Sequence, residues 1–147
     1  MNIFTTKEFI SEVQKLLKNK AHANCEKDII ESIFKKTIDE IKSIGTKRLG
    51  GHPEKNPFIR KRIGSEKTGK SSGYRLYFWL FIIEENVYLM FIHPKTGRRS
   101  TTNISSEKQK ELVKTYKSCK KNKEFIELDF DKVKNKIVYT STKKVVF

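Results

Sequence analysis

The sequence is poor in the residues that build disulfide frameworks, metal centres and membrane spans. Its 147 residues include two cysteines, three histidines and three prolines. Cys25 and Cys119 lie far apart, without the close spacing of zinc ligands, so we expect both to be reduced core residues. No apolar run approaches the roughly 20 residues of a membrane-spanning helix. The longest run, residues 76–83, has the length of a buried strand. The sequence therefore predicts neither a metal nor a cofactor, and no segment that enters a membrane.

The first residues also lack the basic and apolar segments of a secretory signal, which favours a cytoplasmic protein. Acidic residues are scarce, since 17 of them face 32 lysines and arginines and leave a net charge of +15. A folded domain this basic repels itself, which points to an anionic partner. Nucleic acid, an anionic membrane surface and an acidic protein all fit. A lysine-rich source proteome would produce the same excess without any partner.

The N-terminal part has the apolar periodicity of two helices. Residues 5–20 carry one apolar stripe, with Thr5 as the predicted N-cap. Residues 25–44 repeat the pattern, and Gly45 follows where a helix C-cap belongs. These segments predict a helical hairpin. The glycines and prolines of residues 45–57 predict a loop.

The remainder of the chain reads mainly as strands. We expect strands at residues 58–63, 74–83 and 87–93, a helix that begins after Ser105 or Ser106 and ends near Lys117, and a terminal β-hairpin at residues 125–130 and 136–147. The predicted fold class is α+β, with an N-terminal helical hairpin packed on a small antiparallel sheet and a C-terminal helix. We expect one domain at residues 1–120 and an extension at residues 121–147 that packs on it.

Residues 64–71, Gly-Ser-Glu-Lys-Thr-Gly-Lys-Ser, match the phosphate-binding P-loop pattern. That motif functions only between a strand and a helix, because the helix N-terminus completes the phosphate cradle. Here Gly73 leads directly into Tyr74 and a strongly strand-forming run. The sequence therefore predicts a basic turn between two strands in place of a nucleotide site.

Basic side chains concentrate around this turn. Between residues 46 and 76 nine basic residues face two acidic ones: Lys47, Arg48, Lys55, Arg60, Lys61, Arg62, Lys67, Lys70 and Arg75. Strand alternation places Arg60 and Arg62 on one face and Lys61 on the other. Arg75 begins a buried strand, where a charge needs a partner or a function.

A second basic group follows the partner strand of the predicted hairpin. The hairpin brings Lys95, Arg98 and Arg99 back beside Arg75, and such convergence is typical of a phosphate-backbone site. Acidic metal ligands are sparse nearby, so the remaining candidates for the chemistry are lysine, arginine and tyrosine side chains. Cations can cleave RNA by stabilising the phosphorane formed when the 2′-OH attacks the adjacent phosphate, and a lysine of lowered pKa can serve as base. DNA lacks this hydroxyl, so the route applies only to RNA.

Structural explanations compete with this hypothesis. Arg60, Lys61 and Arg62 would also protect an edge strand from aggregation. Lys67 and Lys70 would also suit an ordinary turn, and His93 would suit the end of a buried strand. The aromatic residues of the 74–83 strand fit a core better than a base-stacking surface.

Three segments together resemble the RelE/ParE superfamily, and most of all its RelE and HigB branches. They are the basic strand at residues 58–63, the Gly-Lys-x-x-Gly-Tyr-Arg segment at residues 69–75, and the apolar strand that ends at His93-Pro94-Lys95. The resemblance covers roughly residues 3–117. It implies a ribosome-dependent mRNA endonuclease that acts as a toxin and is neutralised by a cognate antitoxin protein.

The resemblance also assigns site residues. Arg75 matches the family's catalytic arginine, which binds the scissile phosphate, and Lys95 matches the basic residue after the last core strand. Lys67 and Lys70 fall on the family's basic strand–turn positions. No tyrosine or histidine follows Lys95 before the last helix. The base is then Lys67, Lys70 or His93, or the catalysis differs. The expected RNA-binding residues are Arg60, Lys61, Arg62, Arg98 and Arg99.

Two other functions fit the same residues. One is a non-enzymatic inhibitor of DNA gyrase, of the ParE kind. The other is a basic RNA-binding module without catalysis. A protein-binding inhibitor needs no convergent phosphate site, so the cluster around Arg75 favours the nuclease.

Overall fold

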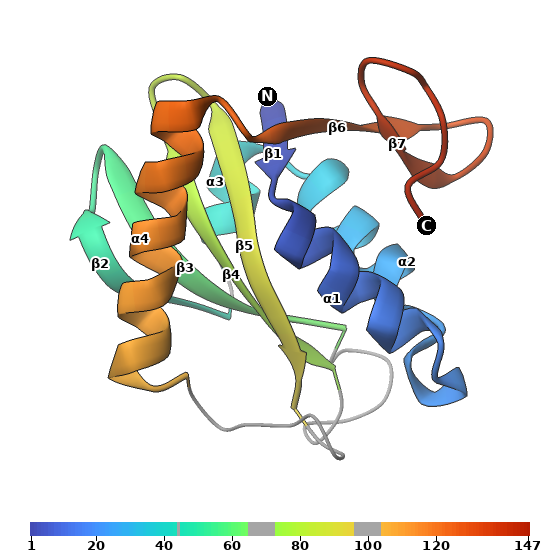
Figure 1. Ribbon diagram of the computed structural model, residues 1–147, viewed down its shortest axis with the longest axis horizontal. Coiled ribbons are helices and arrows are strands. Elements are labelled where there is room, and N and C mark those ends of the chain that lie inside the picture. Colours follow the sequence, from blue (N-terminus) through green and yellow to red (C-terminus); the bar gives the residue numbers. More distant parts are fainter. Residues whose placement is uncertain (44, 65–72, 96–103) are drawn as a thin grey trace.

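A computed structural model describes residues 1–43, 45–64, 73–95 and 104–147 of the chain (Figure 1). The described strands form one mixed sheet in the order β2-β3-β4-β5-β1-β6-β7. Their bounds are β1 (Asn2–Thr5), β2 (Thr46–His52), β3 (Asn56–Ile63), β4 (Tyr74–Phe81), β5 (Asn86–Pro94), β6 (Ile126–Asp131) and β7 (Lys136–Tyr139). The helical segments are α1 (Lys7–Leu17), the 3₁₀ turn η1 (Lys20–His22), α2 (Cys25–Ile29), the π-helical η2 (Ile30–Phe34), α3 (Ile38–Lys42) and α4 (Ser106–Asn122).

The first element is a strand, which corrects the predicted fold class. β1 lies inside the sheet, parallel to β5 and antiparallel to β6, so the sheet is mixed. The expected arrangement, a helical hairpin followed by a small antiparallel sheet, is wrong. Thr5 belongs to this strand, where its buried hydroxyl donates to the Leu89 carbonyl at 2.9 Å. Thr6 caps α1 instead, accepting from the Phe9 amide at 3.1 Å. β1 has only four residues, so its alternating pattern is too short to predict a strand next to the strong helical pattern that follows it.

The second predicted helix is interrupted. Its apolar residues still pack into the core, but a π-helical turn follows Ile29, and α3 begins anew at Thr37. Thr37 and Glu40 form a reciprocal capping box, which marks a true helix start. Periodicity alone could not show this break, because the apolar stripe continues across it.

The loop predicted at residues 45–57 is also wrong, because it contains β2. Gly51 has a φ of +73° and β2 slips register between Arg48 and Gly50, so the glycines shape an irregular edge strand. Tertiary pairing with β3 overrides the weak strand propensity of these residues.

Other predictions are confirmed. β4 and β5 form the antiparallel hairpin, the strand predicted at residues 58–63 lies within β3, and Ser105 caps α4. β4 starts at Tyr74, as expected of a strand after the P-loop-like segment, most of which lies outside the described residues. Both cysteines are buried and unbridged. α4 continues to Asn122, beyond its predicted end near Lys117.

The C-terminal extension completes the sheet. β6 and β7 pair as the predicted hairpin, and β6 also pairs with β1. The buried carboxylate of Glu26 on α2 binds the Lys136 ammonium and accepts from the Ile137 amide at 2.9 Å. The extension is therefore anchored to the N-terminal helices as well as to the sheet.

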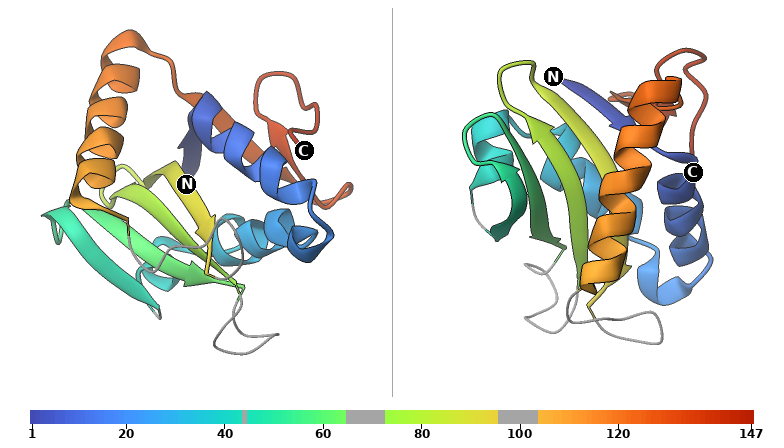
Figure 2. Two further views of the ribbon diagram at one scale, coloured as in Figure 1. Left: turned by 60° about the horizontal axis from the view of Figure 1, so that its bottom comes forward. Right: turned by 60° about the vertical axis from the view of Figure 1, so that its left-hand side comes forward.

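Apolar side chains cover both faces of the sheet. One core lies between the sheet and the N-terminal helices, and includes Phe9, Ile29, Ile33, Leu76, Phe78 and Leu89. The second lies beneath α4 and is mostly aromatic, with Phe58, Tyr77, Tyr88, Met90 and Leu112. The left view of Figure 2 shows α4 and the N-terminal helices apart, with the central strands between them. The α4 face carries the candidate site.

Candidate nucleic-acid interface

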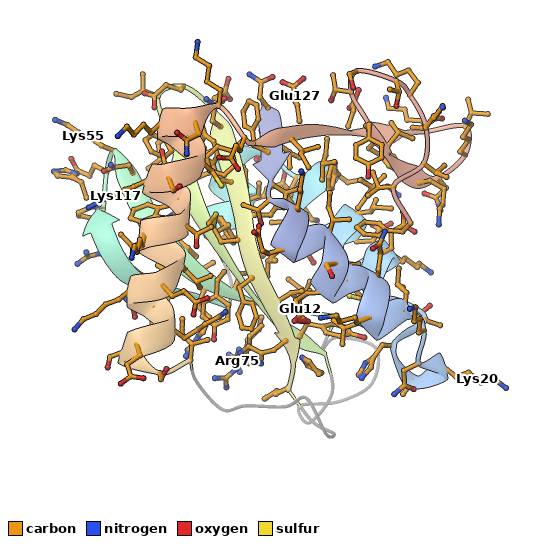
Figure 3. All side chains as sticks on the ribbon, viewed as in Figure 1. Glu12, Lys20, Lys55, Arg75, Lys117 and Glu127 are labelled. Atoms are coloured by element: carbon orange, nitrogen blue, oxygen red, sulfur yellow. The ribbon has the colours of Figure 1, made fainter. Side chains whose placement is uncertain are left out.

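Two rows of side chains cross neighbouring strands on the α4 face. Strand pairing sets Arg62 opposite Arg75, and Arg75 opposite His93. Two pairs further along, and therefore on the same face, Arg60 is opposite Tyr77, and Tyr77 is opposite Phe91. Residues paired across strands lie on the same face of the sheet. The register therefore brings Arg60, Arg62 and Arg75 together in one cluster. Figure 3 shows Arg75 at the end of the sheet beside the first turns of α4, far from Lys55 and Lys117.

The guanidinium groups of this cluster repel one another. The pKa of Arg75 is lowered from its ordinary value by burial, then by the charges of Arg60 and Arg62, against an opposing effect of Tyr77. Arg60 and Arg75 are half-buried and Arg62 is exposed. Like charges on one face of a sheet destabilise the protein, and a bound anion relieves their repulsion. The arrangement suits a phosphate, which accepts several charge-assisted hydrogen bonds.

Tyr77 and His93 form the neutral floor beside these cations. The Tyr77 hydroxyl lies 3.0 Å from His93 Nε2, and both side chains are buried. The pKa of His93 is lowered by burial and by the charges of Arg75 and Arg60, against the effect of its contact with the Pro94 carbonyl. Burial raises the pKa of Tyr77. Both groups are therefore neutral near pH 7, and His93 serves to position Tyr77.

Lys95 joins the cluster through the end of the β4–β5 ladder. Its amide donates to the Gly73 carbonyl at 3.0 Å, one pair beyond Tyr74 and Pro94. Strand alternation then places Lys95 on the same face as His93 and Arg75. The backbone pairing brings Lys95 next to the start of β4, and the convergence of its ammonium with Arg75 stays a prediction.

Lys61 does not belong to the site. It lies on the opposite face, as alternation predicted, and its buried ammonium donates to the Ile41 carbonyl at 3.1 Å. Its predicted RNA-binding role is therefore corrected to a structural one, in which it binds a carbonyl at the end of α3. The predicted catalytic residues Lys67 and Lys70, and the predicted RNA-binding residues Arg98 and Arg99, lie outside the described residues.

Sequence reasoning missed an aromatic residue at the border of the cluster. Phe91 is half-buried, and its ring centroid lies 5.9 Å from that of Tyr77 and 5.8 Å from that of His93. The ammonium of Lys108 on α4 lies 4.6 Å from the Phe91 centroid. Alternation with His93 would have placed Phe91 on this face, but nothing in the sequence shows where α4 packs.

The comparisons with known proteins offer no family. Neither the protein-family models, nor the curated proteins, nor the solved structures contain a match to this chain. Within the described residues, no group of three or more histidine, cysteine or acidic side chains is arranged to bind a metal ion. No helix in the described part of the chain has the length and apolarity to cross a membrane. Function must therefore be argued from the cluster itself.

Proposed function

We propose that the protein is a metal-independent endoribonuclease that cleaves mRNA in the cytoplasm, as the toxin of a toxin–antitoxin pair. The observation that supports this most is the cross-strand row of Arg62 and Arg75, with Arg60 two pairs away on the same face. The proposal rests on this cluster and its chemistry; the resemblance to RelE and HigB toxins adds the ribosome and the antitoxin as expected partners. The net charge of +15 supports an acidic antitoxin.

The proposed reaction is an internal transesterification. The ribose 2′-oxygen attacks the adjacent phosphorus and the bond from phosphorus to the 5′-oxygen breaks, which leaves a 2′,3′-cyclic phosphate and a 5′-hydroxyl. The 2′-hydroxyl gives its proton to an amine in its neutral form, and the leaving oxygen takes up a proton. Lys67 and Lys70 are the candidate amines. Arg75 and Arg60 stabilise the charge that develops on the phosphorane oxygens.

The decisive variant is Arg75→Gln, which removes the charge and keeps hydrogen-bonding capacity. Loss of one such transition-state contact costs on the order of 100-fold or more in rate. We expect RNA cleavage to fall by this factor, and growth inhibition to disappear with it. Lys117→Gln is the matched control, because it removes one positive charge on α4 far from Arg75 (Figure 3).

The measurement is mapping of new mRNA 5′ ends after expression in growing cells, with cleavage of a purified RNA alongside. Toxicity that persists in Arg75→Gln without RNA cleavage would favour gyrase inhibition. RNA binding by the wild-type protein without new 5′ ends would favour the non-catalytic binding module. Cleavage that is equal in the wild type and Arg75→Gln would refute the proposed site.

The antitoxin is tested separately. Expression with the neighbouring genes of its operon should yield a stable complex with an acidic protein. High-level expression of the protein alone, without effect on growth, would contradict its role as a toxin.

A further inference from the structure

We propose that Phe91 is a stacking position for a nucleobase, covered in the free protein by the exchangeable side chain of Lys108. The inference rests on the proposed RNA substrate and adds a base subsite to the phosphate cluster. Single-stranded RNA is commonly bound by a cationic groove in combination with aromatic rings, because every base has a face that can stack.

The position of Phe91 fits this role. Arg75 lies opposite His93 on the paired strand, so Phe91, two residues before His93, is its diagonal neighbour. Diagonal pairs of this kind lie about 7–8 Å apart, within reach of long and aromatic side chains. A nucleotide whose phosphate is bound by Arg75 can therefore place its own base or the next one over Phe91.

The contacts of Lys108 are weak enough to be exchanged. Its ammonium lies over the Phe91 ring at 4.6 Å and near the Glu111 carboxylate at 3.6 Å. The side chain of Lys108 is 33% exposed and that of Glu111 is 65% exposed, so solvent screens this ion pair. When a base takes the ring face, the ammonium can move to a phosphate of the same strand. The lysine then exchanges a cation–π contact with Phe91 for a charge-assisted hydrogen bond to the phosphate.

The chain contains a matched aromatic that lacks the phosphate cluster. Phe81 is also half-buried on the α4 face, and the Lys120 ammonium lies 5.3 Å from its centroid. Phe81 is at the opposite end of β4 from Arg75, paired with Asn86. Lys120 also donates to the Tyr88 hydroxyl at 3.3 Å, which fixes its position. Phe81 is therefore the control for a lysine-covered ring without a neighbouring phosphate site.

The experiment compares two uncleavable probes of equal length by fluorescence anisotropy. One is a single-stranded oligodeoxynucleotide, and the other has the same sugar–phosphate backbone without bases. The wild type should bind the base-containing probe roughly 5- to 100-fold more tightly, the range of one stacked base. Phe91→Leu should lose most of this preference and keep its affinity for the abasic probe. Phe91→Tyr and Phe81→Leu should both retain the preference.

A preference for bases that survives in Phe91→Leu, or that falls equally in Phe81→Leu, overturns the inference. Thermal unfolding checks that each variant is folded, and Phe91→Met, which keeps an apolar side chain without a ring, replaces leucine if leucine prevents folding. RNA cleavage that depends on Arg75, combined with an unchanged base preference in the Phe91 variants, would reject the subsite alone. A base preference that depends on Phe91, without any cleavage by the wild type, would reject the nuclease and leave the subsite.

Discussion

The hydroxyl of Tyr77 donates to Nε2 of His93 across neighbouring strands, at 3.0 Å, directly beneath the arginine cluster. The other ring nitrogen, Nδ1, lies 3.1 Å from the Pro94 carbonyl. A carbonyl only accepts, so Nδ1 carries the proton and Nε2 is the acceptor. This hydrogen bond fixes both buried side chains, and Arg60 and Arg75 lie opposite Tyr77 and His93 on the neighbouring strands.

Removal of the Tyr77 hydroxyl should destabilise the fold. Tyr77→Phe leaves Nε2 of buried His93 without its donor, and an unsatisfied buried polar group costs about 1–3 kcal/mol. We expect the free energy of unfolding, measured in urea, to fall by that amount. Tyr139→Phe on β7 should change it by less than about 0.5 kcal/mol, since no hydrogen bond of the Tyr139 hydroxyl is found among the described residues. Equal effects of the two changes would contradict the assigned bond.

His93 should make stability depend on pH. Its pKa in the folded protein lies below 6.5, so the unfolded chain binds the proton more readily. Stability is therefore fully present above about pH 6.5 and is lost as the pH falls towards the lower, folded-state pKa. His93→Gln should flatten this part of the stability–pH curve. Burial also lowers the pKa of His22, so this histidine contributes a pH dependence of the same sign. The variant His22→Gln measures that contribution separately. Proton NMR titration should place the His93 midpoint below 6.5; a midpoint above 6.5 would contradict this reasoning.

Two adjacent glycines of β2 should differ strongly in their tolerance of alanine. At Gly51 φ is +73°, and an added Cβ would lie 2.2 Å from the Asn56 carbonyl oxygen and 3.0 Å from the Trp79 ring. The conformation alone costs about 1–2 kcal/mol in a non-glycine residue, and the overlap with backbone adds to it. At Gly50 the nearest atom is Gln109 Nε2 at 4.0 Å. We expect Gly51→Ala to lower the urea midpoint strongly and Gly50→Ala to leave it nearly unchanged. A tolerated Gly51→Ala would show that the β2–β3 edge is assigned wrongly.

The Glu26 carboxylate should stabilise the C-terminal strands. It is buried and binds both the Lys136 ammonium and the Ile137 amide, and hydrogen bonds to a charged group are worth about 1.5–3 kcal/mol. Glu26→Ala should cost about 2 kcal/mol of unfolding free energy and increase proteolysis of residues 132–147. Glu111→Ala, in an exposed ion pair, should cost less than about 1 kcal/mol. Proteolysis that is unchanged in Glu26→Ala would mean that the β1–β6 pairing alone holds the extension.

The cationic site was partly predictable from local pattern. Alternation separated Arg60 and Arg62 from Lys61, and the β4–β5 hairpin returned Lys95 towards Arg75, because a strand has a strict period of two and a tight turn fixes which ends meet. The pairing of β3 with β4 set Arg62 opposite Arg75, and no short-range signal contains that register. Tyr77 and His93 were expected to be core residues, and both are buried, but they also lie opposite the arginines of the cluster, and Phe91 borders it.

The sequence by itself determined the strands around residues 58–93, the start of α4 at Ser105 or Ser106, and the excess of positive charge. The strands and the helix start depend on side chains close together in the chain, and the charge depends on composition alone. Only the tertiary structure decided that residues 2–5 enter the sheet beside β5, that glycine-rich β2 becomes its edge, and that α4 places Lys108 over Phe91. Those features depend on backbone hydrogen bonds and packing between segments up to about eighty residues apart. A weak local preference is overruled there by the energy of pairing and burial.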